Sequence, residues 1–134
     1  MPASVHQLMS GCGFPSAPIL TCTLPVMGQP AVFGVHGSVA AAAGVVRLFP
    51  FKGALFTHAN LAGSVERCDV YLNSESFVLA RFATDGNGDF AFSHNIPPVQ
   101  VLCGSRWVVQ GLFYAPSGQN RFGASNALLL QFGN

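Results

Sequence analysis

Charged side chains are scarce in this sequence. Six Lys and Arg and five Asp and Glu make up 8% of its 134 residues, where a typical protein has about 25%. The formal net charge is only +1. So few scattered cations cannot form the basic surface that nucleic acids need, which excludes nucleic acid as a partner. Intrinsic disorder is excluded because half of the residues are hydrophobic.

Long hydrophobic runs are also lacking. The longest apolar stretches, such as Val39–Val46, fall far short of the roughly 20 residues that a membrane-spanning helix needs. The length predicts one domain over residues 1–134. A surface with so few charges is poorly protected against association. We therefore expect part of it to contact further copies of the chain; a monomer with a neutral polar coat is the alternative.

The cysteines show no metal-binding or redox spacing. None of the four forms a Cys-x-x-Cys pair, and an even number in a short, lysine-poor chain fits two disulfides in an oxidising compartment. Three pairings are open. We favour Cys12 with Cys68 and Cys22 with Cys103, because both bridges would tie the N-terminal segment to later strands. Four buried free thiols are the alternative.

Helical patterns are nearly absent, and short apolar or alternating runs recur about every ten residues between turn residues. This predicts an antiparallel β-sandwich of seven to nine strands, Greek-key or jelly-roll-like. Phe77–Phe82 and Trp107–Phe113 are apolar on both faces apart from Arg81 and Gln110, which predicts central strands or strands covered by a neighbouring subunit. The predicted strands are Ile19–Leu24, Ala31–His36, Val45–Phe51, Cys68–Leu72, Phe77–Ala83, Phe90–His94, Trp107–Tyr114 and Ala127–Phe132.

Asp85-Gly86-Asn87-Gly88-Asp89 is the sharpest local motif. Oxygen ligands at Asp85, Asn87 and Asp89, separated by glycines, resemble half of a calcium loop. Asn-Gly and Asp-Gly are also the preferred dipeptides of a tight hairpin, and predicted strands flank the motif. We favour the turn over a calcium site, and we expect no cofactor.

Catalytic patterns are missing. No Gly-x-Ser-x-Gly elbow occurs, and five acidic residues leave few pairs for acid–base chemistry. We expect a protein that is not an enzyme.

Three aromatic residues are candidates for binding a sugar. Tyr71, Trp107 and Tyr114 could form a stacking platform, with Asn73 and Gln110 supplying hydrogen bonds. Tyr71 is predicted to face outward. A single tryptophan in a central strand is more often part of the core, and we favour that interpretation for Trp107.

The C-terminal third resembles an uncharacterised secreted β-sandwich module. That module recurs at the C-terminal ends of extracellular proteins of planctomycete-like and myxobacterium-like bacteria. The resemblance implies an exported, disulfide-bonded domain of a surface structure, with no catalytic residues. Cys22 and Cys103 depart from its usual pattern. The motifs that carry the resemblance are Ile96-Pro97-Pro98, Leu102-x-Gly104, Trp107–Leu112, Ser125–Leu128 and Phe132-Gly133.

Together these features predict an extracellular or cell-surface structural subunit that associates with itself, into a fibre or surface layer. The contact would be edge-strand pairing, or a candidate N-terminal arm, residues 1–11, laid along a neighbour's sheet. A carbohydrate-binding module of a secreted protein is the alternative.

Overall fold

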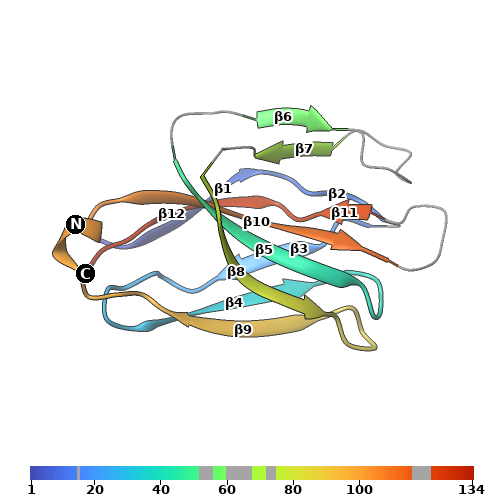
Figure 1. The fold of residues 1–134 in the computed structure, drawn as a ribbon, viewed down its shortest axis with the longest axis horizontal. Helices are drawn as coiled ribbons and strands as arrows, with labels where there is room; N and C mark the ends of the chain where they lie inside the picture. Colours follow the sequence, from blue (N-terminus) through green and yellow to red (C-terminus); the bar gives the residue numbers. More distant parts are fainter. Residues whose placement is uncertain (15, 52–55, 60–67, 72–74, 116–121) are drawn as a thin grey trace.

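The computed structural model describes residues 1–14, 16–51, 56–59, 68–71, 75–115 and 122–134; in the two short central segments it describes the backbone and the Val70 side chain. Two antiparallel sheets lie face to face (Figure 1), which confirms the predicted β-sandwich, and Phe56–Ala59 and Cys68–Tyr71 pair in a separate two-stranded sheet. The strands are β1 (Ser4–Met9), β2 (Cys12–Gly13), β3 (Ile19–Cys22), β4 (Pro30–His36), β5 (Ala43–Pro50), β6 (Phe56–Ala59), β7 (Cys68–Tyr71), β8 (Phe77–Ala83), β9 (Phe90–Asn95), β10 (Arg106–Tyr114), β11 (Phe122–Ala124) and β12 (Ala127–Gln131), and the short helix η1 covers Gln100–Leu102.

β10 is the central strand of the larger sheet. It pairs with β5 along one edge from Trp107 to Tyr114. Along its other edge, the first half pairs with β12 and the second half with β11. β8 lies beyond β5 at one border, and β1 and β2 lie beyond β12 and β11 at the other. The central position predicted for this segment is confirmed.

Two strand positions of the larger sheet, the one next to β10 and the border beyond it, are each filled by an interrupted strand. Ser125 and Asn126 separate β11 from β12, and Ser10 and Gly11 separate β1 from β2. With each interrupted pair counted as one, the two sheets hold eight strands in the described part of the chain. This agrees with the seven to nine that the sequence predicts.

The smaller sheet contains β3, β4 and β9, with β4 in the middle. The chain crosses between the sheets from β4 to β5, and it crosses back from β8 to β9, which lies beside β4. β4 and β9 thus form an antiparallel pair in one sheet, and β5 and β8 form an antiparallel pair in the other. Among the described residues β8 pairs only with β5, and β9 pairs only with β4. Each is therefore the border strand of its own sheet, and the two lie on the same side of the sandwich (Figure 1).

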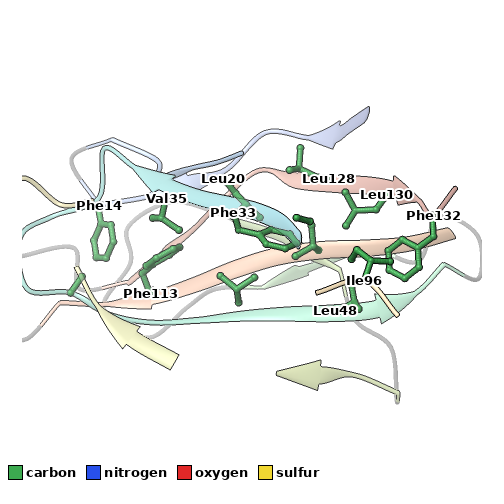
Figure 2. Packing of buried hydrophobic residues seen from close by; sticks show 14 of the residues in the cluster. Phe14, Leu20, Phe33, Val35, Leu48, Ile96, Phe113, Leu128, Leu130 and Phe132 are labelled. Atoms are coloured by element: carbon green, nitrogen blue, oxygen red, sulfur yellow. The ribbon is translucent and has the colours of Figure 1, made fainter. Parts of the chain in front are cut away.

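The main core fills the space between the sheets. Figure 2 shows Phe33 and Val35 of the smaller sheet pointing toward Phe113, Leu48 and Leu130 of the larger one. All five side chains are buried. Successive residues of a strand face opposite sides, and the outward-facing Val32 and His36 of β4 are exposed, which fixes the register of β4 in the sandwich.

Stacked phenylalanine rings link the border strands β8 and β9. The ring centroids of Phe82 and Phe90 lie 4.2 Å apart with an interplanar angle of 3°. Phe92 stacks on Phe33 of β4 at 5.0 Å. Aromatic contacts of this kind stabilise beyond their buried area. The Phe82–Phe90 contact joins the two sheets, whereas the Phe92–Phe33 contact lies within the smaller one.

The larger sheet is also apolar on its outer face. Phe49, Val108 and Ala127 form a second buried cluster there, and Val108 has no exposed surface. β7 lies beside β10, and its Val70 is buried. Burial on both faces explains why the sequence of β10 shows no polar alternation.

All eight predicted strands are present with shifts of one or two residues at their ends, but four others were missed. β1, β2, β6 and β11 are short or lack β-branched alternation, so the periodicity gave no signal for them. β1 lies inside residues 1–11, the segment expected as a candidate arm. It pairs instead with β12 of the same chain, from Ser4 opposite Gln131 to Met9 opposite Ala127.

The prediction of a central position for Phe77–Phe82 is wrong. β8, which contains this segment, is a border strand paired with β5. Its apolar residues are partly left in solvent: Phe77 is 55% exposed and Val78 is 40% exposed. For β8, therefore, apolar residues at successive positions did not mean that both faces of the strand are buried.

Candidate functional site

The border of the sandwich next to β3 is closed by one side chain. The Leu20 N–H of β3 donates to Asn126 Oδ1 at 2.7 Å, and Asn126 Nδ2 donates to the Leu20 carbonyl at 3.0 Å. Asn126 Nδ2 also donates to Gln7 Oε1 of β1 at 3.3 Å. Asn126 thus makes the two backbone hydrogen bonds to Leu20 that a neighbouring strand would otherwise make, and it links the smaller sheet to the larger one.

A buried polar network holds Asn126 in this position. The Gly111 N–H of β10 donates to Ser125 Oγ at 2.8 Å, and that hydroxyl donates to the Asn126 carbonyl at 2.8 Å. Gln110 Nε2 donates to the Ser125 carbonyl at 3.0 Å. Gln110 is only 2% exposed. The expectation that Gln110 offers hydrogen bonds to a sugar is therefore wrong, and Asn73 lies outside the described residues.

The opposite border, made by β8 and β9, is open. In the part of the chain that the structure describes, β5 is the only strand paired with β8, and β4 the only one paired with β9. A border strand presents a row of backbone N–H and C=O groups to any chain that can pair with it. This open border is the candidate functional site.

β8 is the more apolar strand of the open border. Six of its seven residues are apolar, and Arg81 carries its only charge. The register with β5 shifts between Val46 and Arg47, opposite Ala80 and Val78. Beyond this irregularity β8 pairs regularly with β5 from Ala80 as far as Ala83.

Charges that would protect the borders are almost absent. Natural sheets discourage edge-to-edge pairing with charged side chains, especially lysine, or with proline on the border strand. β1, β3, β8 and β9 together contain a single formal charge, that of Arg81, and no proline. At the β3 border Asn126 already occupies the backbone groups of Leu20, whereas no described contact of this kind covers β8.

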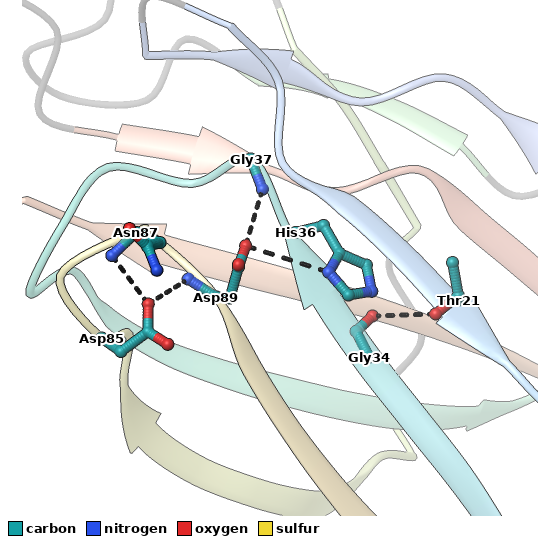
Figure 3. A network of polar contacts seen from close by, with 7 residues as sticks. All are labelled: Thr21, Gly34, His36, Gly37, Asp85, Asn87 and Asp89. Atoms are coloured by element: carbon teal, nitrogen blue, oxygen red, sulfur yellow. Dashed lines mark hydrogen bonds and ion pairs between the residues drawn. The ribbon is translucent and has the colours of Figure 1, made fainter.

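The Asp85–Asp89 turn joins the two border strands (Figure 3). Asp85 Oδ1 accepts the Asn87 N–H at 2.8 Å and the Asp89 N–H at 3.0 Å. These backbone hydrogen bonds, the one from Asp89 above all, lower the pKa of Asp85. The tight turn is confirmed. It is not a hairpin as predicted, because the strands that it connects belong to different sheets.

The same turn is fastened to the loop after β4. Asp89 Oδ1 accepts the Gly37 N–H at 3.3 Å and lies 3.8 Å from His36 Nδ1. The carboxylate oxygens proposed as calcium ligands thus already serve backbone groups. Among the described residues, no group of three or more His, Cys, Asp or Glu side chains could hold a metal ion.

The three aromatic candidates do not form one platform. Trp107 and Tyr114 lie at opposite ends of β10 and, seven residues apart, on opposite faces of it. Trp107 packs against the core, 6.0 Å from the Phe132 ring centroid, in line with the favoured interpretation. Tyr114 is 40% exposed on the outer face, 5.0 Å from Phe122. The Tyr71 side chain lies outside the described residues.

The structure corrects one half of the cysteine prediction. Cys22 and Cys103 are both free thiols, so the predicted bridge between them is wrong. The Cys22 thiol donates to the Thr23 carbonyl at 3.0 Å, and burial raises its pKa to about 12. Cys12 is not a free thiol. The Cys68 side chain lies outside the described residues, and the Cys12–Cys68 pairing stays a prediction.

No protein-family model and no curated protein sequence matches this chain. In the part of the chain that the structure describes, no helix is long and apolar enough to cross a membrane.

Proposed function

We propose that this chain is a structural subunit that associates with copies of itself through the open border, by antiparallel pairing of β8. The observation that carries the proposal is the exposed, apolar and almost uncharged edge of this seven-residue strand. Backbone pairing supplies affinity in such contacts, and the side chains beside the edge supply register. Repetition of the contact would build a fibre or a layer.

Pairing at β8 is favoured over exchange of the N-terminal segment. β1 already lies along β12, from Ser4 opposite Gln131 onward. Exchange of the N-terminal segment would require the β1–β12 backbone hydrogen bonds to break before β1 can pair with β12 of a neighbouring copy. The border at β8 needs no such opening, because its outer side has no strand partner in the described structure.

A charge on the β8 edge tests the proposal. Val78 lies opposite Arg47 on β5, so a Val78→Glu side chain can pair with that cation and leave the fold intact. We expect wild-type protein to form larger species as concentration rises, measured by sedimentation velocity, and the variant to remain a single chain. Wild-type protein that stays monomeric at millimolar concentration contradicts the proposal.

The matched control is Val101→Glu. Val101 lies on η1, outside both sheets, and is 81% exposed. It gives the same change in net charge as Val78→Glu. We expect it to associate like the wild type. Equal loss of association in both variants would show that overall charge, rather than the β8 edge, controls the assembly.

The proposed location is outside the cell or at its surface, as in the secreted module that the sequence resembles. Support comes from the backbone, because β2, which carries Cys12, lies beside β7, which carries Cys68. Two such strands are suitably placed for a bridge, and stable disulfides belong to oxidising compartments.

A carbohydrate-binding module is the second candidate, favoured by one feature. Tyr114 and Phe122 line a hollow of about 330 Å³ on the outer face of the larger sheet, together with Arg81. An exposed aromatic ring beside a guanidinium suits stacking and hydrogen bonding to a sugar. A glycan array tests it: binding that Tyr114→Ala abolishes supports this function, and absence of any bound glycan rejects it.

A further inference from the structure

A large apolar cavity opens between the two sheets at the open border. Its volume is about 390 Å³, and it lies at the end of the core where Figure 2 shows Leu48, Ile96, Leu130 and Phe132 together. β8 contributes Phe77 to its wall. Protein interiors contain few voids larger than a water molecule, whereas ligand pockets begin at about 300 Å³.

The wall of the cavity offers water almost nothing to bind. Of twelve lining residues, only His94 and Trp107 contain polar side-chain atoms. His94 is exposed at the end of β9. The Trp107 indole N–H already donates to Ser105 Oγ at 3.0 Å. A water molecule needs two to four polar partners to stay in a cavity, so this space is poorly suited to water.

Aromatic rings provide much of the remaining wall. Phe77 meets Trp107 edge-on with ring centroids 6.0 Å apart, and Trp107 lies 6.0 Å from Phe132 at an interplanar angle of 20°. Phe33 lines the inner end. Rings held at these separations leave faces and edges free for another ring. The absence of charge in the wall disfavours an ionised ligand, whose desolvation nothing would offset.

We propose that this cavity is a binding site for a neutral, apolar ring molecule. The ligand would enter between β8 and β9, where no backbone pairing blocks the way, and its rings would pack among Phe33, Trp107 and Phe132. The site is separate from the hollow beside Tyr114, and it does not depend on self-association.

Two dyes that share one ring system provide the test. Phenylnaphthylamine is neutral, and anilinonaphthalenesulfonate is its sulfonated analogue. Trp107, the only tryptophan in the sequence, can transfer excitation energy to a dye bound beside it. We expect saturable transfer to the neutral dye with one molecule bound per chain, and binding of the sulfonate weaker by at least about tenfold. Equal binding of both dyes would overturn the proposal.

Filling the cavity locates the dye. Leu102→Phe adds a ring at a partly buried wall position, and Ile96→Phe adds one at a buried wall position. We expect either variant, once its fold is verified by circular dichroism, to weaken neutral-dye binding by at least about tenfold. The matched control is Leu112→Phe, on the outer face of β10, and it should bind the dye like the wild type.

The remaining outcomes also decide the matter. Unchanged binding in Leu102→Phe and Ile96→Phe, or equal weakening in Leu112→Phe, places the dye elsewhere and rejects the site. If one filled variant does not fold, the other carries the comparison. Measurements at the lowest usable protein concentration keep the result independent of association through β8, so failure of either proposal leaves the other standing.

Discussion

Asn126 gives the sharpest test of how the sandwich is held closed. Its amide makes two hydrogen bonds to Leu20, which is 1% exposed. Asn126→Ala would leave the Leu20 N–H and C=O buried without partners, at about 1–3 kcal/mol for each group. The expected loss in free energy of unfolding is therefore about 2–6 kcal/mol, a large part of the roughly 5–15 kcal/mol that stabilises a typical domain.

Urea unfolding measures this loss as a lower transition midpoint at unchanged slope. Gln7→Ala is the control, because it removes only the 3.3 Å contact with Asn126 Nδ2 and should cost less than about 1 kcal/mol. A loss in Asn126→Ala no greater than in Gln7→Ala would refute the reasoning.

The isosteric Asn126→Asp variant adds a second check. Its carboxylate can still accept the Leu20 N–H, but its other oxygen would face the Leu20 carbonyl and repel it. The pKa of the new carboxyl in the folded state should therefore be raised above its value in the unfolded chain. The variant should approach wild-type stability as the pH falls through that raised pKa, because the protonated group can donate again.

Three further results are expected. Gly88→Ala should lower the free energy of unfolding, measured by thermal denaturation, by about 1–3 kcal/mol. The reason is that Gly88 has φ +77° and an added Cβ would meet the Ser38 carbonyl. Gly86→Ala is the control and should be nearly neutral, because the space around Gly86 is open. The pKa of Asp85 is lowered in the folded chain, so its stabilising contribution is complete above pH 3.8 and is lost as the pH falls through the lowered value. In Asp85→Ala the free energy of unfolding should therefore fall less steeply with decreasing pH in the acid range. An unchanged decrease contradicts this. Under native, non-reducing conditions Cys103 should react with a thiol reagent well before Cys22, whose pKa is about 12, and equal rates would exclude that order.

Much of the fold was predictable because strand periodicity is local. Runs such as Phe77–Ala83 and Trp107–Tyr114 have the β-branched and aromatic composition that marks a strand without any tertiary information. What periodicity could not reveal is position within a sheet. Both runs are apolar on both faces, yet β10 has strand partners on both edges and β8 on one. That difference arises from partners distant in sequence.

The site was predictable only in part. Sparse charge indicated a surface poorly protected against association, but not which strands form the borders of the sheets. The role of Asn126 left no local signal, because its partner Leu20 lies 106 residues away. Trp107 and Tyr114 were both named as platform candidates, although their odd spacing within one predicted strand already places them on opposite faces. The error over Cys22 and Cys103 has the same origin, since spacing along the chain does not report distance in space.

The pairing of the first strand with the last has a consequence for biosynthesis. β1 cannot meet β12 until residue 131 has left the ribosome, and β10 lacks the neighbours along one of its edges until the same moment. The segments from β1 to β10 must therefore wait, with apolar surface uncovered, before the larger sheet can be completed. Newly made molecules should be most vulnerable to misassembly during this interval.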